Sequence, residues 1–203
     1  MPTEALGPWL RRFVSRPNAT LRLVCLPHGG GGASAYLGWS ELLPPEVELL
    51  AVQYPAREDR FGETVPRDMS DLVGRLADAV EPVLDRPYAL FGHSMGATVA
   101  YELAQELRTR ELPQPVHLVA SGREAPHDEK GGDVHRRDDD GLYAELMRLG
   151  GTNPEIMRIP EMRAVVLAYV RADYRLIRRL RHHLYSTGRD ADLVCEPARI
   201  LLG

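Results

Sequence analysis

A serine set between two glycines is the feature of this chain whose spacing suits covalent chemistry. The pattern Gly92-x-Ser94-x-Gly96 follows the apolar run 88–91 and precedes an amphipathic helical stretch. At a sharp turn from strand to helix, neighbours almost without side chains let a serine hydroxyl stand clear as a nucleophile. The backbone N–H of Met95 and the positive end of the following helix would then face the oxyanion formed by attack on a carbonyl. A chance match in a glycine turn is the alternative, and the flanking strand and helix favour the nucleophile.

A run of four glycines, residues 29–32, follows another apolar segment at 21–26. Around a serine of this kind, a glycine loop after an earlier strand supplies the second N–H of the oxyanion hole, here from the loop 29–32. Glycine suits that place because the backbone must approach a substrate oxygen closely. A phosphate-binding loop is the alternative, but the sequence has neither Gly-Lys-Ser/Thr nor Gly-x-Gly-x-x-Gly followed by an acidic residue.

The elements that must position these two loops alternate between strand and helix. Predicted strands lie at 21–26, 47–54, 88–91 and 116–120. Helical patterns fall between them, at 36–43, at 70–83 and after the serine. Such alternation predicts an α/β fold with a mostly parallel sheet that helices cover on both faces. Near the N-terminus, Trp9, Leu10 and Phe13 have helical spacing and are expected to dock on this body.

The pattern changes to helix alone at about residue 133. Three helix-like pieces follow, at 142–149, 154–157 and 161–183, before a final strand-like run at 194–203. In an α/β enzyme, a helical insertion between late strands is typical of a lid over the active site. We therefore expect one domain over 1–203, with a lid at approximately 133–185.

Composition narrows the class of protein. The chain has 203 residues, of which 44% are hydrophobic, and a net charge of -4, which fits one globular domain and does not suggest nucleic-acid binding. No apolar stretch is long enough to cross a membrane, and the first residues lack the pattern of a signal peptide. We expect a cytoplasmic protein whose two cysteines, Cys25 and Cys195, are buried and reduced.

Several longer motifs occur in order along the chain and together resemble one family, the type II thioesterases that accompany polyketide synthases and nonribosomal peptide synthetases. The resemblance covers residues from about 20 to 203. Its motifs are Leu23-Val24-Cys25-Leu26-Pro27-His28-Gly29-Gly30, Tyr54-Pro55-Ala56-Arg57-Glu58-Asp59-Arg60, Phe91-Gly92-His93-Ser94-Met95-Gly96-Ala97, Ser121-Gly122-Arg123-Glu124-Ala125-Pro126 and Leu149-Gly150-Gly151-Thr152.

The resemblance implies an α/β-hydrolase fold with a mobile helical lid. It implies hydrolysis of acyl thioesters on the phosphopantetheine arm of acyl or peptidyl carrier proteins, as an editing step in antibiotic biosynthesis. Ser94 would be the nucleophile, and Met95, Gly29 and Gly30 would form the oxyanion hole. The resemblance implies a monomer without metal or cofactor, whose partner is the carrier protein.

The resemblance leaves two members of the catalytic triad unassigned. In this fold the order is serine, acid, histidine, and the family carries the acid after the last-but-one strand. Residues 198–203 match that strand. The acid and the histidine are therefore expected beyond Gly203, and the last strand and helix of the fold are expected to be absent from the sequence. The present histidines are weak candidates for the base: His28, His93, His117, His127, His135, His182 and His183.

Two other functions stay open beside the editing thioesterase. One is a general carboxylesterase for small esters. The other is a module that binds acyl chains or a carrier protein without turnover, which would apply if the chain truly ended at Gly203. Loss of turnover in Ser94→Ala separates both enzymes from the binding module.

Three further groups allow two interpretations each. Arg57, Glu58 and Arg60 are expected to form a structural ion-pair cluster rather than to act chemically. The methionines of the insertion could line an acyl channel or fill the lid core: Met147, Met157 and Met162. The basic end of the last helix could dock an acidic carrier protein, but a solvated face is the favoured interpretation: Arg171, Arg175, Arg178, Arg179, Arg181, His182 and His183.

Overall fold

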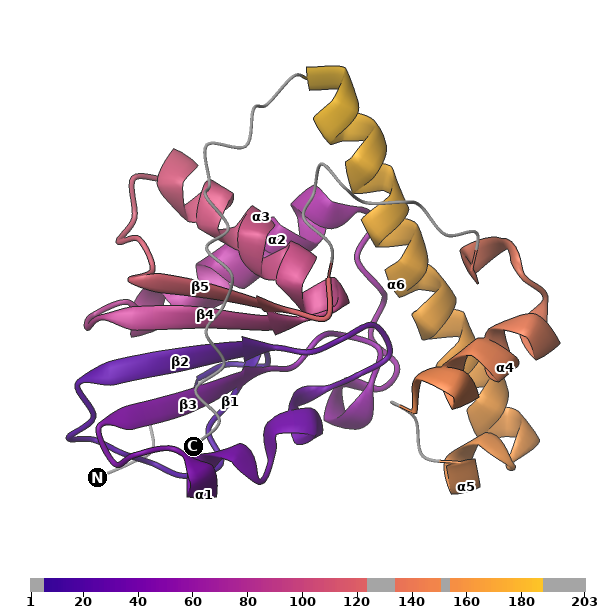
Figure 1. Cartoon of the computed structure of the whole chain (residues 1–203), viewed down its shortest axis with the longest axis horizontal. Coiled ribbons are helices and arrows are strands. Elements are labelled where there is room, and N and C mark those ends of the chain that lie inside the picture. Colours follow the sequence, from indigo (N-terminus) through magenta and orange to yellow (C-terminus); the bar gives the residue numbers. More distant parts are fainter. Residues whose placement is uncertain (1–5, 124–133, 151–153, 188–203) are drawn as a thin grey trace.

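A computed structural model describes residues 6–123, 134–150 and 154–187, with the side chains of the last helix described as far as Ile177. The described residues contain one five-stranded sheet with the order β1-β3-β2-β4-β5. Four strands are parallel, and β1 pairs with β3 in the antiparallel direction. The strands are β1 (Leu10–Arg11), β2 (Leu21–Leu26), β3 (Val47–Val52), β4 (Tyr88–His93) and β5 (His117–Ser121). This is the α/β arrangement that the alternating pattern predicts (Figure 1).

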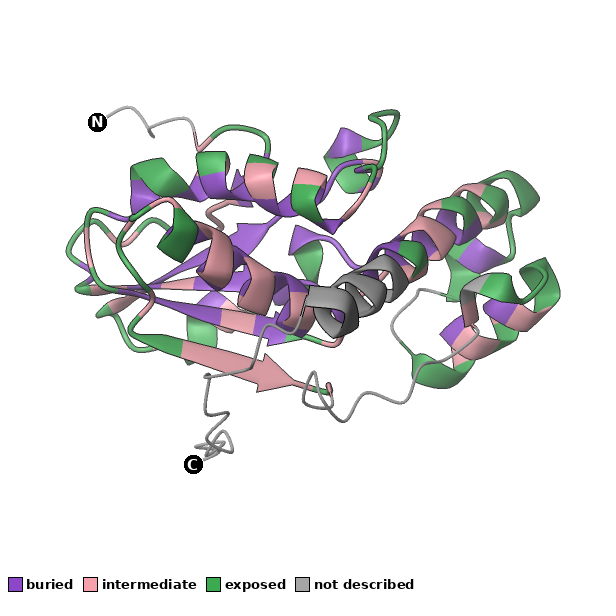
Figure 2. Cartoon of the chain, turned by 90° about the horizontal axis from the view of Figure 1, so that it is seen from above, coloured by how far each residue is buried: buried purple, intermediate pink, exposed green. Residues whose placement is uncertain are grey.

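Helices cover both faces of the sheet because each strand sends alternate side chains to opposite sides. Val24 and Leu26 of β2 belong to the large apolar cluster that also contains the buried faces of α2 (Met69–Val80) and α3 (Met95–Thr109). Cys25 packs on the other side, where η1 (Ala33–Tyr36) and α1 (Trp39–Leu42) cover the sheet. Two short helices complete the loops, η2 (Glu58–Arg60) and η3 (Glu81–Val83). Buried residues lie between these layers in Figure 2.

The N-terminal segment docks on the body, but as a strand and not as the helix that its spacing suggested. Leu10 pairs with Val52, and the Trp9 carbonyl accepts a hydrogen bond of 2.8 Å from the Gln53 N–H. Trp9 and Leu10 are both buried. The edge of β3 offers unpaired backbone groups, and their pairing outweighs a weak helical pattern of three residues.

The remaining described helices form a segment with its own small core, called the helical segment below (residues 134–187). It comprises η4 (Val134–Arg136), α4 (Asp139–Leu149), α5 (Pro154–Met157) and α6 (Pro160–Thr187). Asp138 caps α4 by accepting from the Gly141 N–H, and Gly150 ends it in the left-handed conformation with φ 72°. Figure 1 shows α6 running past the ends of the strands, with α4 and α5 beyond it.

From residue 20 onward, the strands and helices predicted within the described residues are confirmed in type and place, with ends that differ by a few residues. The exception is the helix predicted at 36–43, which is divided into η1 and α1. The predicted strand at 194–203 and Cys195 lie outside the described residues, whereas Cys25 is buried as a free thiol. No helix among the described residues is long and apolar enough to cross a membrane.

Candidate active site

Ser94 sits at the turn between β4 and α3, with backbone angles φ 53° and ψ -114°. Such angles are rare for a residue with a side chain and indicate a strained turn. Its two glycine neighbours make the turn possible. A Cβ on Gly92 would lie 2.1 Å from the Gly96 carbonyl oxygen, and a Cβ on Gly96 would lie 2.0 Å from the Leu26 carbonyl oxygen. The helix starts at Met95, so its N-terminus is directed at the serine.

The end of β5 fixes the same turn from the other side. The Ser94 N–H donates to the Ser121 carbonyl at 2.8 Å, and His93 Nδ1 lies 3.1 Å from Ser121 Oγ. Gly122 has φ 62°, and a Cβ there would lie 2.5 Å from the His93 ring. These contacts give Ser121 and Gly122 a structural role and direct the exposed His93 side chain to β5. The His28 ring lies edge to face against His93, with centroids 6.1 Å apart.

The glycine loop after β2 brings one of its two predicted donors to the serine turn. A Cβ on Gly29 would lie 3.8 Å from the Met95 Cβ, so these two backbones are neighbours. Gly30, with φ 83°, differs: its N–H donates to Asp173 Oδ2 of α6 at 2.8 Å. The structure therefore places Gly29 beside Met95 and turns the Gly30 N–H to the helical segment.

A buried ion pair joins this loop to α6. Arg57 donates to both carboxylate oxygens of Asp173, at 2.8 and 2.9 Å, and to the Gly31 carbonyl at 3.2 Å. The Arg57 and Asp173 side chains are only 3% and 2% exposed. The rings of Tyr54 and Tyr169 each lie 5.1 Å from the guanidinium carbon. Burial lowers the pKa of Arg57, but the Asp173 charge and its hydrogen bonds outweigh burial and raise the pKa, so the guanidinium stays charged.

Comparisons with known proteins identify the family of this chain. The thioesterase domain family matches residues 21–200. The chain is 43% identical over 170 residues to thioesterase PikA5 of Streptomyces venezuelae. The matched region covers 83% of this chain and 60% of that protein.

The chain belongs to the thioesterase family.

Two solved structures of this family confirm the resemblance to type II thioesterases and the α/β-hydrolase fold. The RedJ thioesterase of the prodiginine pathway in Streptomyces coelicolor is 40% identical with a TM-score of 0.75, over 81% of this chain and 65% of that one. The type II thioesterase BorB of the borrelidin cluster is 38% identical with a TM-score of 0.71, over 83% of this chain and 69% of that one. The chain thus spans about two thirds of these thioesterases.

The three residues predicted as one ion-pair cluster, Arg57, Glu58 and Arg60, have different partners in this thioesterase chain. Arg60 pairs with Glu63 at 2.6 Å, and Glu58 accepts from the Ser34 hydroxyl at 2.6 Å, so neither joins Arg57. The sequence analysis does not predict a role for Asp173, the partner of Arg57. Its signal was present, because Asp173 interrupts the apolar α6 positions Val166, Val170 and Ile177.

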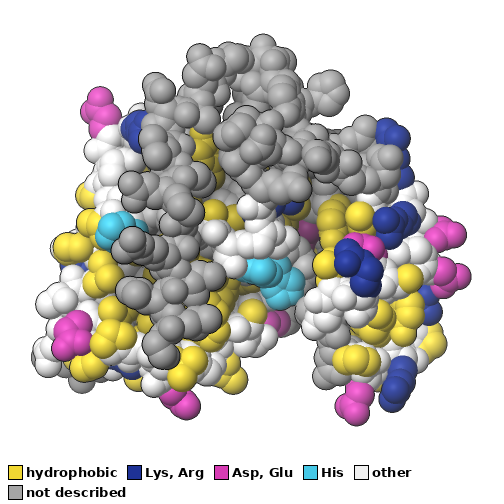
Figure 3. All heavy atoms as spheres, in the orientation of Figure 1, with side chains coloured by type: hydrophobic (Ala, Val, Ile, Leu, Met, Phe, Trp, Pro, Cys, Tyr) yellow, Lys and Arg dark blue, Asp and Glu magenta, His cyan; other side chains and the backbone are white. Residues whose placement is uncertain are grey.

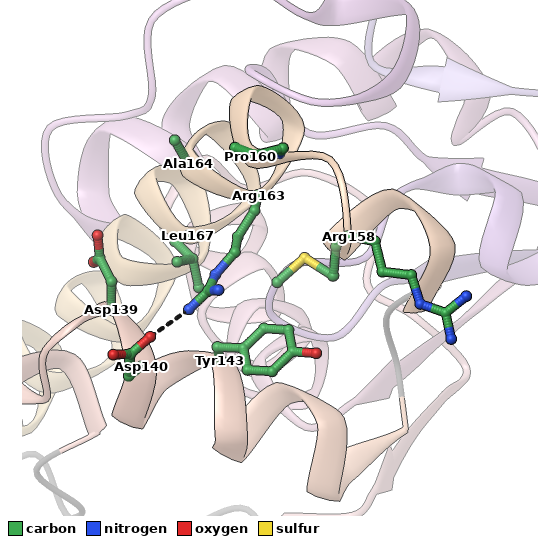
Figure 4. A pocket seen from close by; sticks show the side chains of 9 residues that line it. Asp139, Asp140, Tyr143, Arg158, Pro160, Arg163, Ala164 and Leu167 are labelled. Carbon is green, nitrogen blue, oxygen red and sulfur yellow. Dashed lines mark hydrogen bonds and ion pairs between the residues drawn. The ribbon is translucent and has the colours of Figure 1, made fainter.

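The methionines of the helical segment divide between its core and its surface. Met157 is buried in the small core, Met147 packs against it, and Met162 is 41% exposed. A cavity of about 570 Å³ lies among α4, α5 and α6, lined by residues that include Tyr143, Met157 and Leu167. Arg163 spans part of it to pair with Asp140 at 2.6 Å (Figure 4). None of the residues predicted for the oxyanion hole lines this cavity.

Two basic residues of α6, Arg163 and Arg171, take part in local pairs, and Arg175 is exposed. Arg171 pairs with Asp139 of α4 at 2.7 Å, and the side chains from Arg178 onward lie outside the described part. Figure 3 shows basic, acidic and apolar side chains interspersed over the helical segment. Among the described residues, no three His, Cys, Asp or Glu side chains gather as metal ligands.

Proposed function

We propose that the protein hydrolyses acyl thioesters held on the phosphopantetheine arm of acyl or peptidyl carrier proteins, as an editing step of polyketide or nonribosomal peptide assembly. The observation that carries the proposal is the strained Ser94 turn at the head of α3 beside the glycine loop. Membership of the thioesterase family and the similarity to PikA5, RedJ and BorB support the class of substrate.

The reaction proceeds by acyl transfer in two steps. A histidine takes the Ser94 proton, Oγ attacks the thioester carbonyl, and the tetrahedral intermediate expels the phosphopantetheine thiolate. The protonated histidine gives its proton to that thiolate. The same histidine then takes a proton from water, which attacks the acyl-serine, and returns it to Ser94 Oγ as the carboxylic acid leaves. The histidine and its acid are expected beyond Gly203. The N–H of Met95 and the N–H of Gly29 serve the oxyanion, because the Gly30 N–H already donates to Asp173.

The helical segment acts as a lid over the active site in this proposal. The lid and the sheet belong to a single domain. Its place at the carboxyl ends of the strands, beside the glycine loop, supports that role (Figure 1). In this proposal the protein is a cytoplasmic monomer that binds its carrier protein transiently.

The test measures hydrolysis by the full-length protein of one acyl group in three forms: on a carrier protein, on free pantetheine and as a p-nitrophenyl ester. Ser94→Ala is expected to lower turnover by about 10⁵-fold or more. Ser70→Ala, an exposed serine of α2, is the matched control and keeps full turnover.

The outcomes separate the three candidate functions. Faster hydrolysis from the carrier protein than from the two small substrates supports the proposal. Equal or faster hydrolysis of the p-nitrophenyl ester indicates a general esterase. Carrier-protein binding without turnover, unchanged in Ser94→Ala, indicates a binding module and overturns the proposal.

A further inference from the structure

The middle of α6 forms one wall of the glycine loop. Val170 and Asp173 lie three residues apart, on the same face of the helix. A Cβ on Gly30 would lie 2.8 Å from Val170 Cγ2, and a Cβ on Gly29 would lie 3.7 Å from Asp173 Cβ. The loop therefore fits against α6 only because Gly30 carries no side chain, whereas Gly29 lies at ordinary van der Waals distance from Asp173.

The Asp173 carboxylate is the polar centre of this contact. It accepts three hydrogen bonds, one from the Gly30 N–H at 2.8 Å and two from the Arg57 guanidinium at 2.8 and 2.9 Å. Hydrogen bonds to an ionised and buried carboxylate are short and strong, so the Gly30 N–H has a firmly held direction. Arg57 holds the next residue as well, through the Gly31 carbonyl.

The contact continues into the body of the protein. Gln53, at the end of β3, accepts from the Ala33 N–H at 2.7 Å and donates to the Arg57 carbonyl at 3.0 Å. Arg57 is thus fixed at its backbone by the body and at its side chain by α6. The glycine loop lies between the two.

Fixing the Gly30 N–H also constrains Gly29. The bond to Asp173 fixes the planar Gly29–Gly30 peptide, which carries the Gly29 carbonyl. The Gly29 N–H belongs to the preceding planar peptide, whose His28 carbonyl accepts from the Gly31 N–H at 2.9 Å. Glycine has little backbone preference of its own, and the loop would otherwise sample many directions. Asp173 holds this turn at the Gly30 N–H, and the bond from Gly31 to His28 closes it. The Gly29 N–H inside the turn therefore has one orientation beside Met95 and needs no rearrangement when charge develops on a substrate oxygen.

We propose that Asp173 is a positioning residue, which holds the glycine loop so that the Gly29 N–H is preset for the oxyanion. This rests on the proposed function, because it assigns Gly29 and Met95 as the oxyanion donors. It also makes the middle of α6 a fixed part of the site.

The test compares two double variants of the full-length protein that both lack the buried charge pair. In Arg57→Gln/Asp173→Asn, the asparagine side-chain oxygen still accepts from the Gly30 N–H. In Arg57→Gln/Asp173→Leu, no acceptor remains there. We expect the leucine variant to have a kcat about 100-fold below that of the asparagine variant, with KM values within about threefold, since a displaced oxyanion donor affects the transition state.

An inhibitor readout separates positioning from a merely structural role. An acyl trifluoromethyl ketone forms a tetrahedral adduct with the serine and needs the oxyanion hole, whereas a non-hydrolysable thioether analogue does not. The leucine variant is expected to lose about 100-fold in affinity for the ketone and to bind the thioether as the asparagine variant does. Arg163→Gln, which breaks an exposed pair of the same helix, is the control with unchanged kcat.

Equal kcat and equal ketone affinity in the two double variants would overturn the positioning role. If the leucine variant does not fold, Asp173→Ser replaces it in the same background, because a serine hydroxyl is too short to reach Gly30. A wild-type protein that hydrolyses neither acyl carrier protein nor acyl pantetheine would instead contradict the proposed function. The two failures are therefore distinguishable.

Discussion

The serine turn and the helical segment meet at the same site, but different interactions hold each of them in place. The turn is fixed by backbone contacts around two glycines, with the large apolar cluster of the sheet directly behind it. The helical segment has a small cluster of its own, in which α4, α5 and the first half of α6 take part. The close approach of backbones at Gly92 and Gly96 fixes the serine turn. A small apolar cluster and a few specific contacts fix the helical segment.

The two regions meet along α6. Val166 and Val170 belong to the small cluster, and Leu176 and Ile177 belong to the large one. Asp173 lies between these pairs and carries the buried bond to Arg57. A helix that shares its length between two cores couples them, and the coupling depends on the residue at the boundary.

Breaking the serine turn should have the largest effect. Gly96→Ala puts a Cβ against the backbone of Leu26 and Pro27, which cannot move without disturbing β2. We expect a loss of more than about 4 kcal/mol in the free energy of unfolding, measured with urea. Gly38→Ala is the control, since nothing lies within 4 Å of its new Cβ, and it should stay within about 0.5 kcal/mol. Similar losses in both variants would contradict steric exclusion as the cause.

Breaking the junction should have the next largest effect. Asp173→Asn leaves the Arg57 charge buried without its partner, and we expect the free energy of unfolding to fall by about 3–5 kcal/mol. Arg163→Gln removes an exposed pair of the same helix and should cost at most about 1 kcal/mol. Equal effects would mean that burial of the pair contributes nothing to the docking of α6.

A cavity in each core should show how far the regions unfold separately. Leu146→Ala in α4 and Leu103→Ala in α3 each remove a buried leucine and should cost about 3 kcal/mol locally. Hydrogen exchange of backbone amides is the measurement. Leu146→Ala should speed exchange in α4 and the start of α6 and leave β4 protected, whereas Leu103→Ala should affect β4. Loss of protection in β4 from Leu146→Ala would contradict separate cores.

The same comparison explains what the sequence could predict. Ser94 and its glycines lie within five residues, and the alternation of strands and helices locates them at one end of a sheet. The pair of Arg57 and Asp173 spans 116 residues, and no local pattern links its members. The two glycines proposed for the oxyanion hole show the limit most clearly: Gly29 and Gly30 are equivalent in sequence, and only a contact with a distant helix distinguishes them.

The smallest expected effect is a loss of stability of α4 at acidic pH, through its carboxyl group at Glu145. The hydrogen bond from Arg148 lowers the pKa of Glu145 below its ordinary value of 4.5, burial opposes this, and Arg137 at 3.0 Å adds to it. A carboxyl with a lowered folded pKa stabilises α4 above about pH 4.5 and loses that contribution as the pH falls through the lower value. We expect wild-type α4 to lose protection against hydrogen exchange below pH 4.5.

Glu145→Gln should remove that acid dependence in α4 and lower its protection slightly at pH 7. Asp71 of α2 provides the comparison in the body, because a backbone hydrogen bond from Arg67 lowers the pKa of its carboxyl against opposing burial, and Arg75 lowers it further. The acid dependence of α2 should be unchanged in Glu145→Gln and absent in Asp71→Asn. If Glu145→Gln altered α2 as much as α4, the two cores would unfold as one unit, and the junction at Asp173 would couple them completely.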